Sequence, residues 1–387
     1  MQVMVTRREP QASGFLQKPL PRVAMIASYE ANCGMATYTK YLLTAMRPLI
    51  SELKVFAEFV EEPTENPEVV RCWDRHKGIY QTIIPEVVKF APDIVYIQHE
   101  YGSMNNPVQW NLLVGHLSSL FRTVVVLHSV YDHVDKLVFE APCNEIIVHS
   151  KPGRDLLIKK GIEVPIHHIP HGCIPPIDID LKFSNMQNKQ LIFQYGFGFE
   201  YKGWTNVNDI IDGLKNEFPD VAYVGIFNMS KFSLMMHSEY YKSLMRNIRD
   251  RHLEEHIVLH KGFRSEQVLF SYMKQARINL FPYWNHPEWR VYGASGAVRL
   301  ALASGTPTIV GDVPFFEEFK GYIPVCSTTE EYVKEMAKIL KDVTYREETQ
   351  KGMLDFINER SWDKVARWYL DCTEDKSFTA PIPERAP

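Results

Sequence analysis

The chain has 387 residues, of which 45% are hydrophobic and 23% are charged, a balance typical of a soluble globular protein long enough for two domains. Its formal net charge of −4 argues against a protein that coats nucleic acid through an overall basic surface, although one local basic groove stays compatible with it. The six cysteines lie far apart without a C-x-x-C pair, so we expect neither a disulfide framework nor a zinc site.

Residues 1–21 read as an N-terminal tail, because they lack the apolar run of a signal peptide. No stretch approaches the ~18 apolar residues that span a bilayer. We therefore expect no membrane span and a cytoplasmic location, which also suits unpaired cysteines.

Strand-like apolar runs alternate with helical patterns from residue 22 onward. Helical spacing is clearest at 34–46 and 151–161. Nearly continuous apolar strands between helices indicate a parallel sheet covered on both faces, and we assign 22–175 to a Rossmann-like domain. The expected strands are 22–28, 53–59, 93–99, 123–129, 145–150 and 167–170.

The same rhythm returns in the second half, which we assign to a second Rossmann-like domain over 188–358. The boundary falls at 173–190, where two prolines and then polar residues interrupt the pattern. A helix at 359–375, with Ser361 as its N-cap, is expected to pack back on the first domain, and the tail 376–387 is expected to be loose. The expected strands are 191–197, 221–227, 256–262, 278–283 and 307–312, and the expected helices are 204–217, 265–276, 294–304 and 329–342.

The fold class that these patterns predict is α/β, with two doubly wound parallel sheets. Such sheets bind ligands beyond the carboxyl ends of their strands, so we expect the active site in a cleft between the domains. His99, Glu100 and Tyr101 end the third strand at the mouth of this cleft, where they suit contacts to an acceptor. Glu100 is also suited to orient His128, and a helix cap or a hydrogen-bonded strand end is the alternative explanation.

The stretch "YGFGFEYKGW" at 195–204 puts glycines between a strand and a helix, a position that commonly cradles phosphate. A dinucleotide fingerprint needs glycine where Tyr201 stands, and a P-loop needs its lysine after the last glycine rather than before it. The remaining interpretation is a tight turn in which Lys202 and the helix N-terminus bind a diphosphate. A glycine-rich turn with a surface lysine is the alternative.

Two further turns have the size of a phosphate site. Gly293, Ser295 and Gly296 open an alanine-rich helix, where free N–H groups suit an anion and where Ser295 is equally suited to simple N-capping. Cys33 and Gly34 follow the first strand and begin a helix. Three such turns, spread over both domains, favour a ligand more than any one of them does alone.

Two groups of residues invite a metal interpretation that we do not favour. Asp178 and Asp180 have the D-x-D spacing of metal–diphosphate sites, but they fall in the expected linker and read as a solvated loop. His167, His168 and His171 lie close in sequence, but strand alternation sends neighbours to opposite faces, so we interpret them as structural.

Taken in order, seven motifs resemble those of the retaining nucleotide-sugar glycosyltransferases of family 4: "CGMATYTKYL", "IQHEYG", "LHSV", "VHS", "IPHG", "GFGFEYKG" and "SGAVRLALASGTPTIV". The resemblance covers residues 22–372. It implies the GT-B fold, with an acceptor-side N-terminal domain and a donor-binding C-terminal domain. It also implies a hexosyl or pentosyl transferase that moves a sugar from a nucleoside diphosphate sugar, such as a UDP-sugar, to a hydroxyl acceptor with retention.

The same resemblance implies roles for individual residues. Lys202 would neutralise the β-phosphate as the glycosidic bond breaks, and His128 would contact the donor sugar or phosphate across the cleft. Neither a metal nor another cofactor is expected beside the nucleotide-sugar co-substrate. The donor-binding residues would be Gly34, Gly196, Gly198, Gly203, Phe263, Arg264, Ser295, Gly296 and Arg299.

The chain departs from the family pattern at two places. Phe197 stands where the donor loop usually has arginine, and the paired glutamates would fall at Tyr292 and Leu300. These departures support one alternative, a non-catalytic sugar-nucleotide binding protein, against which Lys202 and His128 count. A second alternative is a phage-type enzyme that glycosylates hydroxymethylated DNA bases, and a third is a nucleotide-linked oxidoreductase. The acceptor stays open between a small molecule, a glycan, a protein and a modified DNA base.

Overall fold

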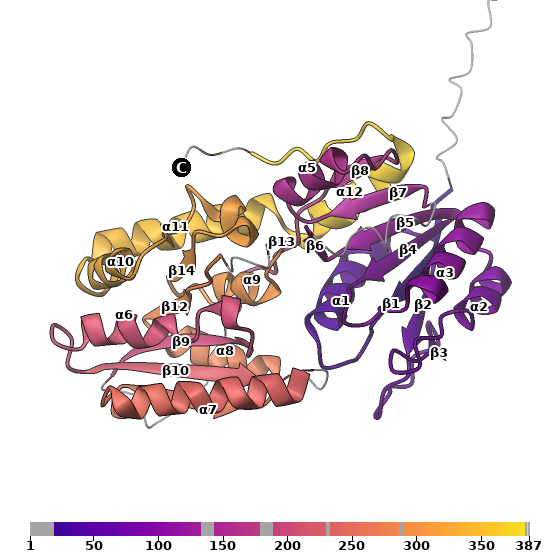
Figure 1. Cartoon of the computed structure of the whole chain (residues 1–387). Helices are drawn as coiled ribbons and strands as arrows, with labels where there is room; N and C mark the ends of the chain where they lie inside the picture. The colour runs from indigo at the N-terminus through magenta and orange to yellow at the C-terminus, as the bar shows by residue number, and fades with distance from the viewer. Residues whose placement is uncertain are drawn as a thin grey trace, which may run out of the picture.

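The computed structural model describes residues 19–132, 143–178, 189–229, 233–285, 290–383 and 385. Within them the chain forms two parallel β-sheets flanked by helices, one from the N-terminal half and one from the C-terminal half (Figure 1). The two sheets lie in separate domains, and the last helix returns to the N-terminal domain. The predicted α/β class with two doubly wound sheets is confirmed.

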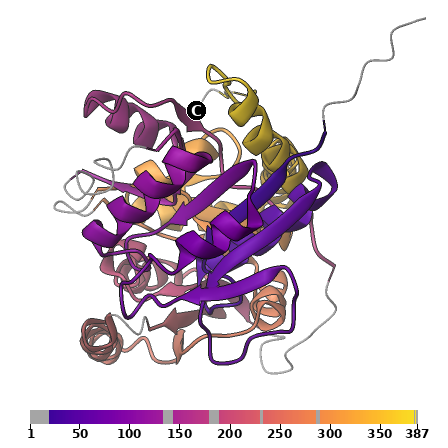
Figure 2. The same cartoon turned by 90° about the vertical axis from the view of Figure 1, so that its right-hand side faces the viewer.

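The N-terminal sheet has seven strands in the order β3-β2-β1-β4-β5-β7-β8, and every neighbouring pair is parallel. Figure 2 faces this domain and shows helices packed over the near side of the sheet. The strands are β1 (Arg22–Ala27), β2 (Glu52–Glu58), β3 (Val69–Trp73), β4 (Ile94–His99), β5 (Arg122–Leu127), β7 (Glu145–Val148) and β8 (Ile166–His168). The helices are α1 (Gly34–Met46), η1 (Arg47–Leu49), α2 (Ile83–Phe90), α3 (Pro107–Leu120) and α5 (Lys151–Lys159).

The C-terminal sheet has six strands in the order β11-β10-β9-β12-β14-β15, again all parallel. The strands are β9 (Gln190–Phe197), β10 (Val221–Asn228), β11 (Ile257–Lys261), β12 (Ile278–Phe281), β14 (Thr308–Gly311) and β15 (Val325–Cys326). The helices are η3 (Glu200–Lys202), α6 (Asn206–Leu214), α7 (Leu234–Asp250), α8 (Glu266–Gln275), α9 (Gly296–Ala303), η5 (Pro314–Phe319), α10 (Thr329–Lys341) and α11 (Val343–Glu359).

Strand order explains where the site lies. In the N-terminal sheet the order reverses at β1, which pairs with β2 on one side and β4 on the other, and in the C-terminal sheet it reverses at β9, between β10 and β12. Loops leave such a switch point in opposite directions, and the gap between them is where doubly wound sheets bind ligands. The loops after β1 and β9 are those that carry Gly34 and Lys202.

The contacts that join the domains in the described part of the chain include two between secondary-structure elements that are distant in sequence. The short strands β6 (Ser129–Tyr131) and β13 (Val291–Gly293), one from each half of the chain, pair as an antiparallel two-stranded sheet. Helix α12 (Trp362–Glu374) follows the C-terminal domain but packs against α1 of the N-terminal domain. The hydroxyls of Tyr38 and Tyr369 lie 2.6 Å apart in that buried contact, and the Tyr96 hydroxyl donates to the Tyr369 carbonyl oxygen at 2.6 Å.

The expected elements agree with the observed ones to within three residues at each end, and most of the expected strands are apolar runs that are buried along nearly their whole length. In β1, for example, Val23 to Ala27 are each 0% exposed, since helices cover both faces of the strand. Several elements were not predicted: β3, β6, β13, β15, α2, α3, α7 and α11. Strand β3 is only partly buried along most of its length, so it lacks the continuous apolar run that marks the others.

The C-terminal segment makes contacts where we expect a loose tail. Ala380 is 6% exposed, Phe378 packs against the core, and Arg385 forms ion pairs with Asp355 and Glu359. Most of the predicted N-terminal tail and of the linker between the domains lies outside the described residues. Among the helices that the structure describes, none is both long enough and apolar enough to cross a bilayer.

Candidate functional site

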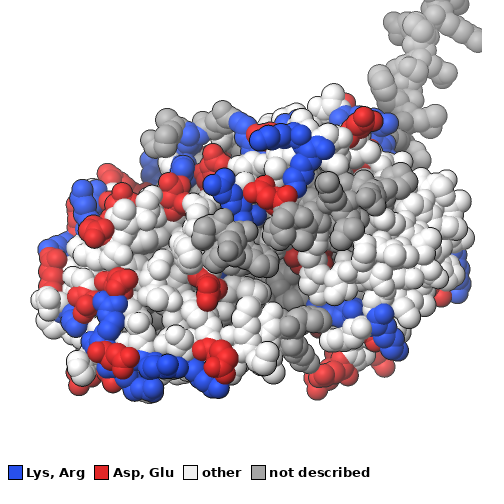
Figure 3. Space-filling view, in the orientation of Figure 1, with Lys and Arg blue, Asp and Glu red and all other residues white. Residues whose placement is uncertain are grey.

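A cleft of about 2330 Å³ lies between the two domains and receives the loops at the carboxyl ends of both sheets. The loops after β1, β4 and β5 line it from the N-terminal domain, and the loop after β9 and the start of α9 line it from the other. On the face of the molecule in Figure 3, Lys and Arg side chains are interspersed with Asp and Glu over both domains. The coloured surface in that view is therefore of mixed charge.

The loop after β9 depends on glycines because neighbouring atoms fill the space of a side chain. A Cβ on Gly198 would lie 2.0 Å from the Phe227 ring, and one on Gly203 would lie 1.8 Å from the Pro282 carbonyl oxygen. Gly203 also has a φ of +73°, in the left-handed region that favours glycine. This turn fixes the backbone of Lys202, the last residue of η3.

Lys202 is a partly buried cation on the wall of the cleft. Its Nζ donates to the Tyr283 hydroxyl at 2.8 Å and lies 4.9 Å from the centre of that ring. Burial alone would lower the pKa of Lys202, but the phenols of Tyr283 and Tyr201 outweigh it and leave the pKa raised. In the part of the chain that the structure describes, the Lys202 ammonium contacts Tyr283 and Tyr201 and forms no ion pair with a carboxylate. An anionic ligand would supply the missing counter-charge.

Two helix N-termini line the same cleft from opposite domains. At α1, Cys33 is the N-cap but its side chain forms no capping hydrogen bond, and the first turn contains no acidic residue. At α9, Ser295 accepts a hydrogen bond from the Val298 N–H at 3.4 Å, so this serine does cap its helix. The amides of Gly34 and Gly296 follow these caps, where the positive end of the helix dipole favours an anion.

His128 directly follows β5 and lines the cleft as a neutral imidazole. Its Nε2 lies 2.8 Å from Gln98 Oε1, so Nε2 donates and Nδ1 carries the lone pair. Burial, followed by the neighbouring His149 and His99, holds the pKa of His128 well below its ordinary value. The ring packs edge-on against Tyr38, with the centroids 4.6 Å apart.

His171 also lines the cleft, although we interpret it from sequence as structural. Its Nδ1 lies 2.7 Å from the Gly172 carbonyl oxygen, which leaves the lone pair on Nε2. A Cβ on Gly296 would lie 3.4 Å from that Nε2, so the imidazole reaches the N-terminus of α9. Burial, followed by the charge of Arg299, lowers the pKa of His171 well below its ordinary value.

His99, the last residue of β4, and the two residues after it differ in whether they line the cleft. Glu100 and Tyr101 line the cleft, and Glu100 accepts hydrogen bonds from Ser129 Oγ at 2.9 Å and the Tyr101 N–H at 3.1 Å. Glu100 therefore contacts the residue after His128 rather than the imidazole itself. His99 does not line the cleft: it is 1% exposed, packs against Trp110, and burial lowers its pKa to about 4.

The donor-binding residues predicted from the sequence also differ in whether they are available in the cleft. Arg299 lines the cleft but is 1% exposed, and its guanidinium is taken up by an ion pair with Glu318 and a 3.0 Å hydrogen bond to the His171 carbonyl oxygen. Gly203 does not line the cleft, which fits its role in the turn. The cleft is lined by Gly34, Gly196, Gly198, Phe263, Arg264, Ser295 and Gly296.

Sequence reasoning missed several polar residues of the cleft. Tyr283 lies two residues after β12, in the aromatic stretch 282–289 for which the sequence slightly favours stacking on a sugar or base, but its contact to Lys202 was not predicted. Glu30, Glu58 and Arg75 line the N-terminal wall, where Arg75 pairs with Glu58. These side chains come from three separate loops and edges, so only the tertiary fold brings them together.

The described residues that could together bind a metal ion lie outside the cleft. Among the described residues, Glu145, His167 and Cys372 are the group whose ligand atoms lie close enough for one ion, and none of the three lines the cleft. Of the predicted D-x-D pair, Asp178 is exposed and contacts Lys274 at 3.4 Å, and Asp180 lies outside the described residues.

Comparisons with known proteins extend this description. No protein-family model matches the chain, and the search of curated proteins gives no match. Solved structures do match: the trehalose-6-phosphate synthase OtsA has a TM-score of 0.72 at 11% identity, over 92% of this chain and 99% of that one. A UDP-forming α,α-trehalose-phosphate synthase from Burkholderia xenovorans in complex with glucose-6-phosphate has a TM-score of 0.71 at 10% identity, over 91% and 100%. Anabaena Alr3699/HepE in complex with UDP has a TM-score of 0.67 at 12% identity, over 91% and 99%.

At these identities the likeness is one of architecture, and it extends over nearly the whole of each chain. The strand orders, the two switch points and the cleft between them agree with it. The chain therefore has the GT-B fold, in which two Rossmann-like domains face each other across a central cleft.

Proposed function

We propose that the protein is a retaining glycosyltransferase that moves a sugar from a nucleoside diphosphate sugar to a hydroxyl acceptor. The observation that carries this proposal is the ammonium of Lys202, which lines the cleft without a carboxylate partner among the described residues. A partly buried cation of this kind costs free energy until an anion neutralises it.

A diphosphate carries the negative charge that Lys202 and the two helix N-termini of the cleft would bind. The N-termini of α1 and α9 approach it from opposite domains, and neither first turn contains an acidic residue. Backbone amides at Gly34 and Gly296 would donate to phosphate oxygens, and Lys202 would neutralise the phosphate that leaves. A diphosphate bound between the helix ends would thus contact both domains at once.

The proposed chemistry requires little beyond positioning and charge. The bond between the sugar carbon and the β-phosphate oxygen breaks, and its electron pair stays on that oxygen, where Lys202 stabilises it. The departing phosphate accepts the proton of the acceptor hydroxyl, whose oxygen bonds the sugar carbon on the same face, so the configuration is retained. We assign no protein nucleophile. We propose no metal in this step, because Lys202 and the two helix ends supply positive charge.

The solved structures of the same fold support a particular donor and acceptor class. One is described as bound to UDP and another as UDP-forming and bound to glucose-6-phosphate. We therefore propose a UDP-sugar as the donor. The N-terminal wall of the cleft, with Glu30, Glu58, Arg75 and His76, suits a small polyhydroxy acceptor.

The test is donor binding and slow donor hydrolysis with UDP-, GDP- and ADP-sugars, without added metal. Release of one nucleoside diphosphate by the unmodified protein, lost in Lys202→Ala and kept in Lys351→Ala, would support the proposal and name the donor. Lys351 is an exposed lysine of α11 and serves as the matched control. Absence of binding to every sugar nucleotide would refute the proposal.

A second candidate function is donor binding without transfer. Leu300 lines the cleft where the family pattern has a glutamate, and Phe197 lines it where that pattern has arginine. Tight donor binding with no turnover, in the presence of a panel of hydroxyl acceptors, would favour this candidate.

A further inference from the structure

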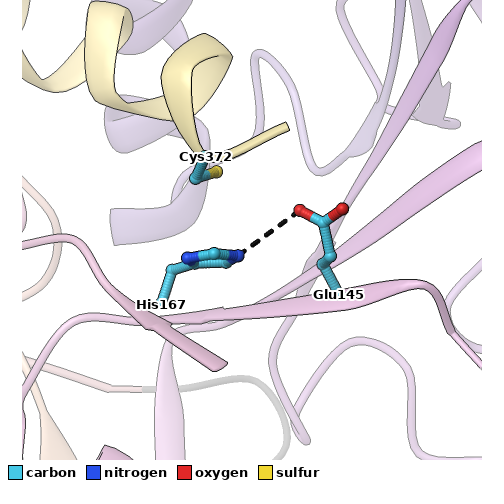
Figure 4. Close-up of side chains that lie close together, drawn as sticks. All are labelled: Glu145, His167 and Cys372. Carbon is cyan, nitrogen blue, oxygen red and sulfur yellow. Dashed lines mark ion pairs between the residues drawn. The ribbon is translucent and has the colours of Figure 1, made fainter. Parts of the chain in front are cut away.

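Three side chains of ligand type meet beneath α12, outside the cleft (Figure 4). Glu145 comes from β7, His167 from β8 and Cys372 from α12. All three are buried, and their ligand atoms lie within 4.8 Å of one another. Because α12 follows the C-terminal domain in sequence, this cluster joins the end of the chain to the N-terminal sheet.

Two buried atoms of the cluster have no hydrogen-bond partner. His167 Nε2 and Glu145 Oε2 lie 3.4 Å apart, the ion pair that Figure 4 marks, and neither atom has another polar partner among the described residues. The two residues are 3% and 0% exposed, so bulk water does not reach them. Buried polar atoms are nearly always hydrogen-bonded in native proteins, and leaving them unpaired costs free energy.

The other contacts of these residues keep the same two atoms free. His167 Nδ1 lies 3.1 Å from the Phe378 carbonyl oxygen, so Nδ1 carries a hydrogen, and in the neutral ring Nε2 carries the lone pair. Glu145 Oε1 accepts from Arg122, whose Nε lies 3.0 Å away, and Oε2 is left over. In its neutral form the imidazole would thus turn its lone pair toward a carboxylate oxygen. The repulsion between that lone pair and the carboxylate oxygen is removed either by a second proton on the ring or by a cation bound between the two atoms.

The thiol of Cys372 favours the cation. Its Sγ points into the space beside the imidazole and the carboxylate in Figure 4, and its one described hydrogen bond, to the Tyr369 carbonyl oxygen at 3.2 Å, is a weak one. A proton on His167 would explain its contact with Glu145 but not why the Cys372 sulfur lies beside them. A zinc ion would explain all three, because Cys, His and Glu are among the ligands that zinc binds in proteins. We propose that Glu145, His167 and Cys372 bind a Zn²⁺ ion that holds α12 against the N-terminal sheet.

The surroundings suit such a site. Metal-bound imidazoles usually donate their other N–H to a carbonyl or carboxylate oxygen, and the His167 Nδ1–H donates to the Phe378 carbonyl oxygen in this way. Tetrahedral zinc holds its ligand atoms roughly 3.3–3.8 Å apart, so the cluster needs to contract by about an ångström, and a water molecule completes the four ligands. The ligands come from distant elements with a single cysteine, which is why cysteine spacing predicts no zinc site and why His167 reads as structural.

The experiment uses the full chain and two metals. The zinc content of the purified protein is measured by mass spectrometry, the metal is removed with a chelator, and the apoprotein is titrated with Co²⁺. We expect about one metal ion per chain, a thiolate-to-cobalt charge-transfer band, and a melting temperature that falls on chelation and returns with Zn²⁺. Cys372→Ala removes the band, and His167→Gln weakens Co²⁺ binding at least about a hundredfold.

Cys326→Ala is the matched control, because Cys326 is also buried but lies in the C-terminal domain. It keeps both the band and the bound metal. A folded, unmodified protein that holds no zinc and gives no cobalt band overturns the proposal and leaves a protonated His167 paired with Glu145. A cobalt band that survives in Cys372→Ala overturns it as well. If the Cys372 variant does not fold, the unmodified protein and Glu145→Gln decide the question by the same titration.

Discussion

Replacement of Lys202 by methionine is expected to weaken binding of a nucleoside diphosphate while leaving binding of the nucleoside unchanged. Methionine keeps most of the length of the side chain and removes only the charge and the donor. Lys202 Nζ has the Tyr283 hydroxyl as its close polar contact at 2.8 Å, and it has no carboxylate partner in the described part of the chain. The phosphates of the ligand would therefore be its main counter-charge.

The size of the effect follows from the distance and the exposure of the charge. Two unit charges about 4 Å apart interact by about 4 kcal/mol at an effective dielectric constant of about 20. Lys202 is only partly buried, so we discount this for solvent screening to about 2 kcal/mol. That difference corresponds to an increase in Kd of about thirtyfold.

The assay is isothermal titration of UDP and of uridine into the unmodified protein, Lys202→Met and Lys351→Met. We expect Lys202→Met to raise the Kd for UDP and not that for uridine, and Lys351→Met to change neither. The UDP affinity of the unmodified protein is also expected to fall with added salt more steeply than that of Lys202→Met. An equal loss of UDP and uridine affinity would mean that the substitution damages the loop, and no loss at all would refute the assignment of Lys202 to the phosphates.

Three predictions concern stability. Tyr38→Phe should lower the free energy of unfolding by about 1–3 kcal/mol in a urea titration, because it leaves the buried Tyr369 hydroxyl without its 2.6 Å partner. Gly198→Ala should lower the melting temperature and abolish UDP binding, because its Cβ would lie 2.0 Å from the Phe227 ring. Burial lowers the pKa of His99 to about 4 from its ordinary 6.5, so the unfolded chain binds more protons between these values. The free energy of unfolding should therefore be largest above pH 6.5 and fall on acidification, by about 1.4 kcal/mol per pH unit from this residue, with a shallower fall in His99→Phe.

Each of these three has a control. A double variant, Tyr38→Phe with Tyr369→Phe, should recover part of the lost stability, and strict additivity of the two single changes would contradict a direct hydrogen bond. Gly34→Ala should leave the melting temperature unchanged, because no atom lies within 4 Å of the added Cβ. A pH dependence that is identical in His99→Phe and the unmodified protein would show that His99 titrates normally.

The sequence predicts those parts of the structure that depend on local patterns. Buried parallel strands are continuous apolar runs, so the sequence predicts them without knowledge of the fold. The glycines at 198 and 203 mark a turn in the sequence, and the φ of +73° at Gly203 is a local reason for glycine, but the Phe227 ring and the Pro282 carbonyl oxygen that exclude side chains there are brought in by the fold. The direction of a side chain at a strand end is not local. His99 is the last residue of β4, yet it packs against Trp110 of α3, whereas Glu100, the next residue, lines the cleft.

Contacts between side chains that are far apart in the sequence could not be predicted either. The Tyr283 hydroxyl reaches Lys202 from 81 positions away, and Cys372 reaches β7 and β8 only because α12 crosses back over the N-terminal domain. Nothing in the local pattern around any of these residues records its partner. Residue spacing therefore finds loops and elements, and tertiary packing decides which polar atoms meet.

The β6–β13 ladder has a consequence for how the two domains can move. It is the antiparallel pair between Ser129–Tyr131 and Val291–Gly293, so it lies directly beside His128 in one domain and two residues before Ser295 in the other. Any rotation that keeps these strands paired must have its axis near the ladder. His128 and the start of α9 would then stay at nearly constant separation, while the outer edges of the two domains would travel in proportion to their distance from that axis. Such a rotation would widen the entrance of the cleft without altering the spacing between His128 and the start of α9.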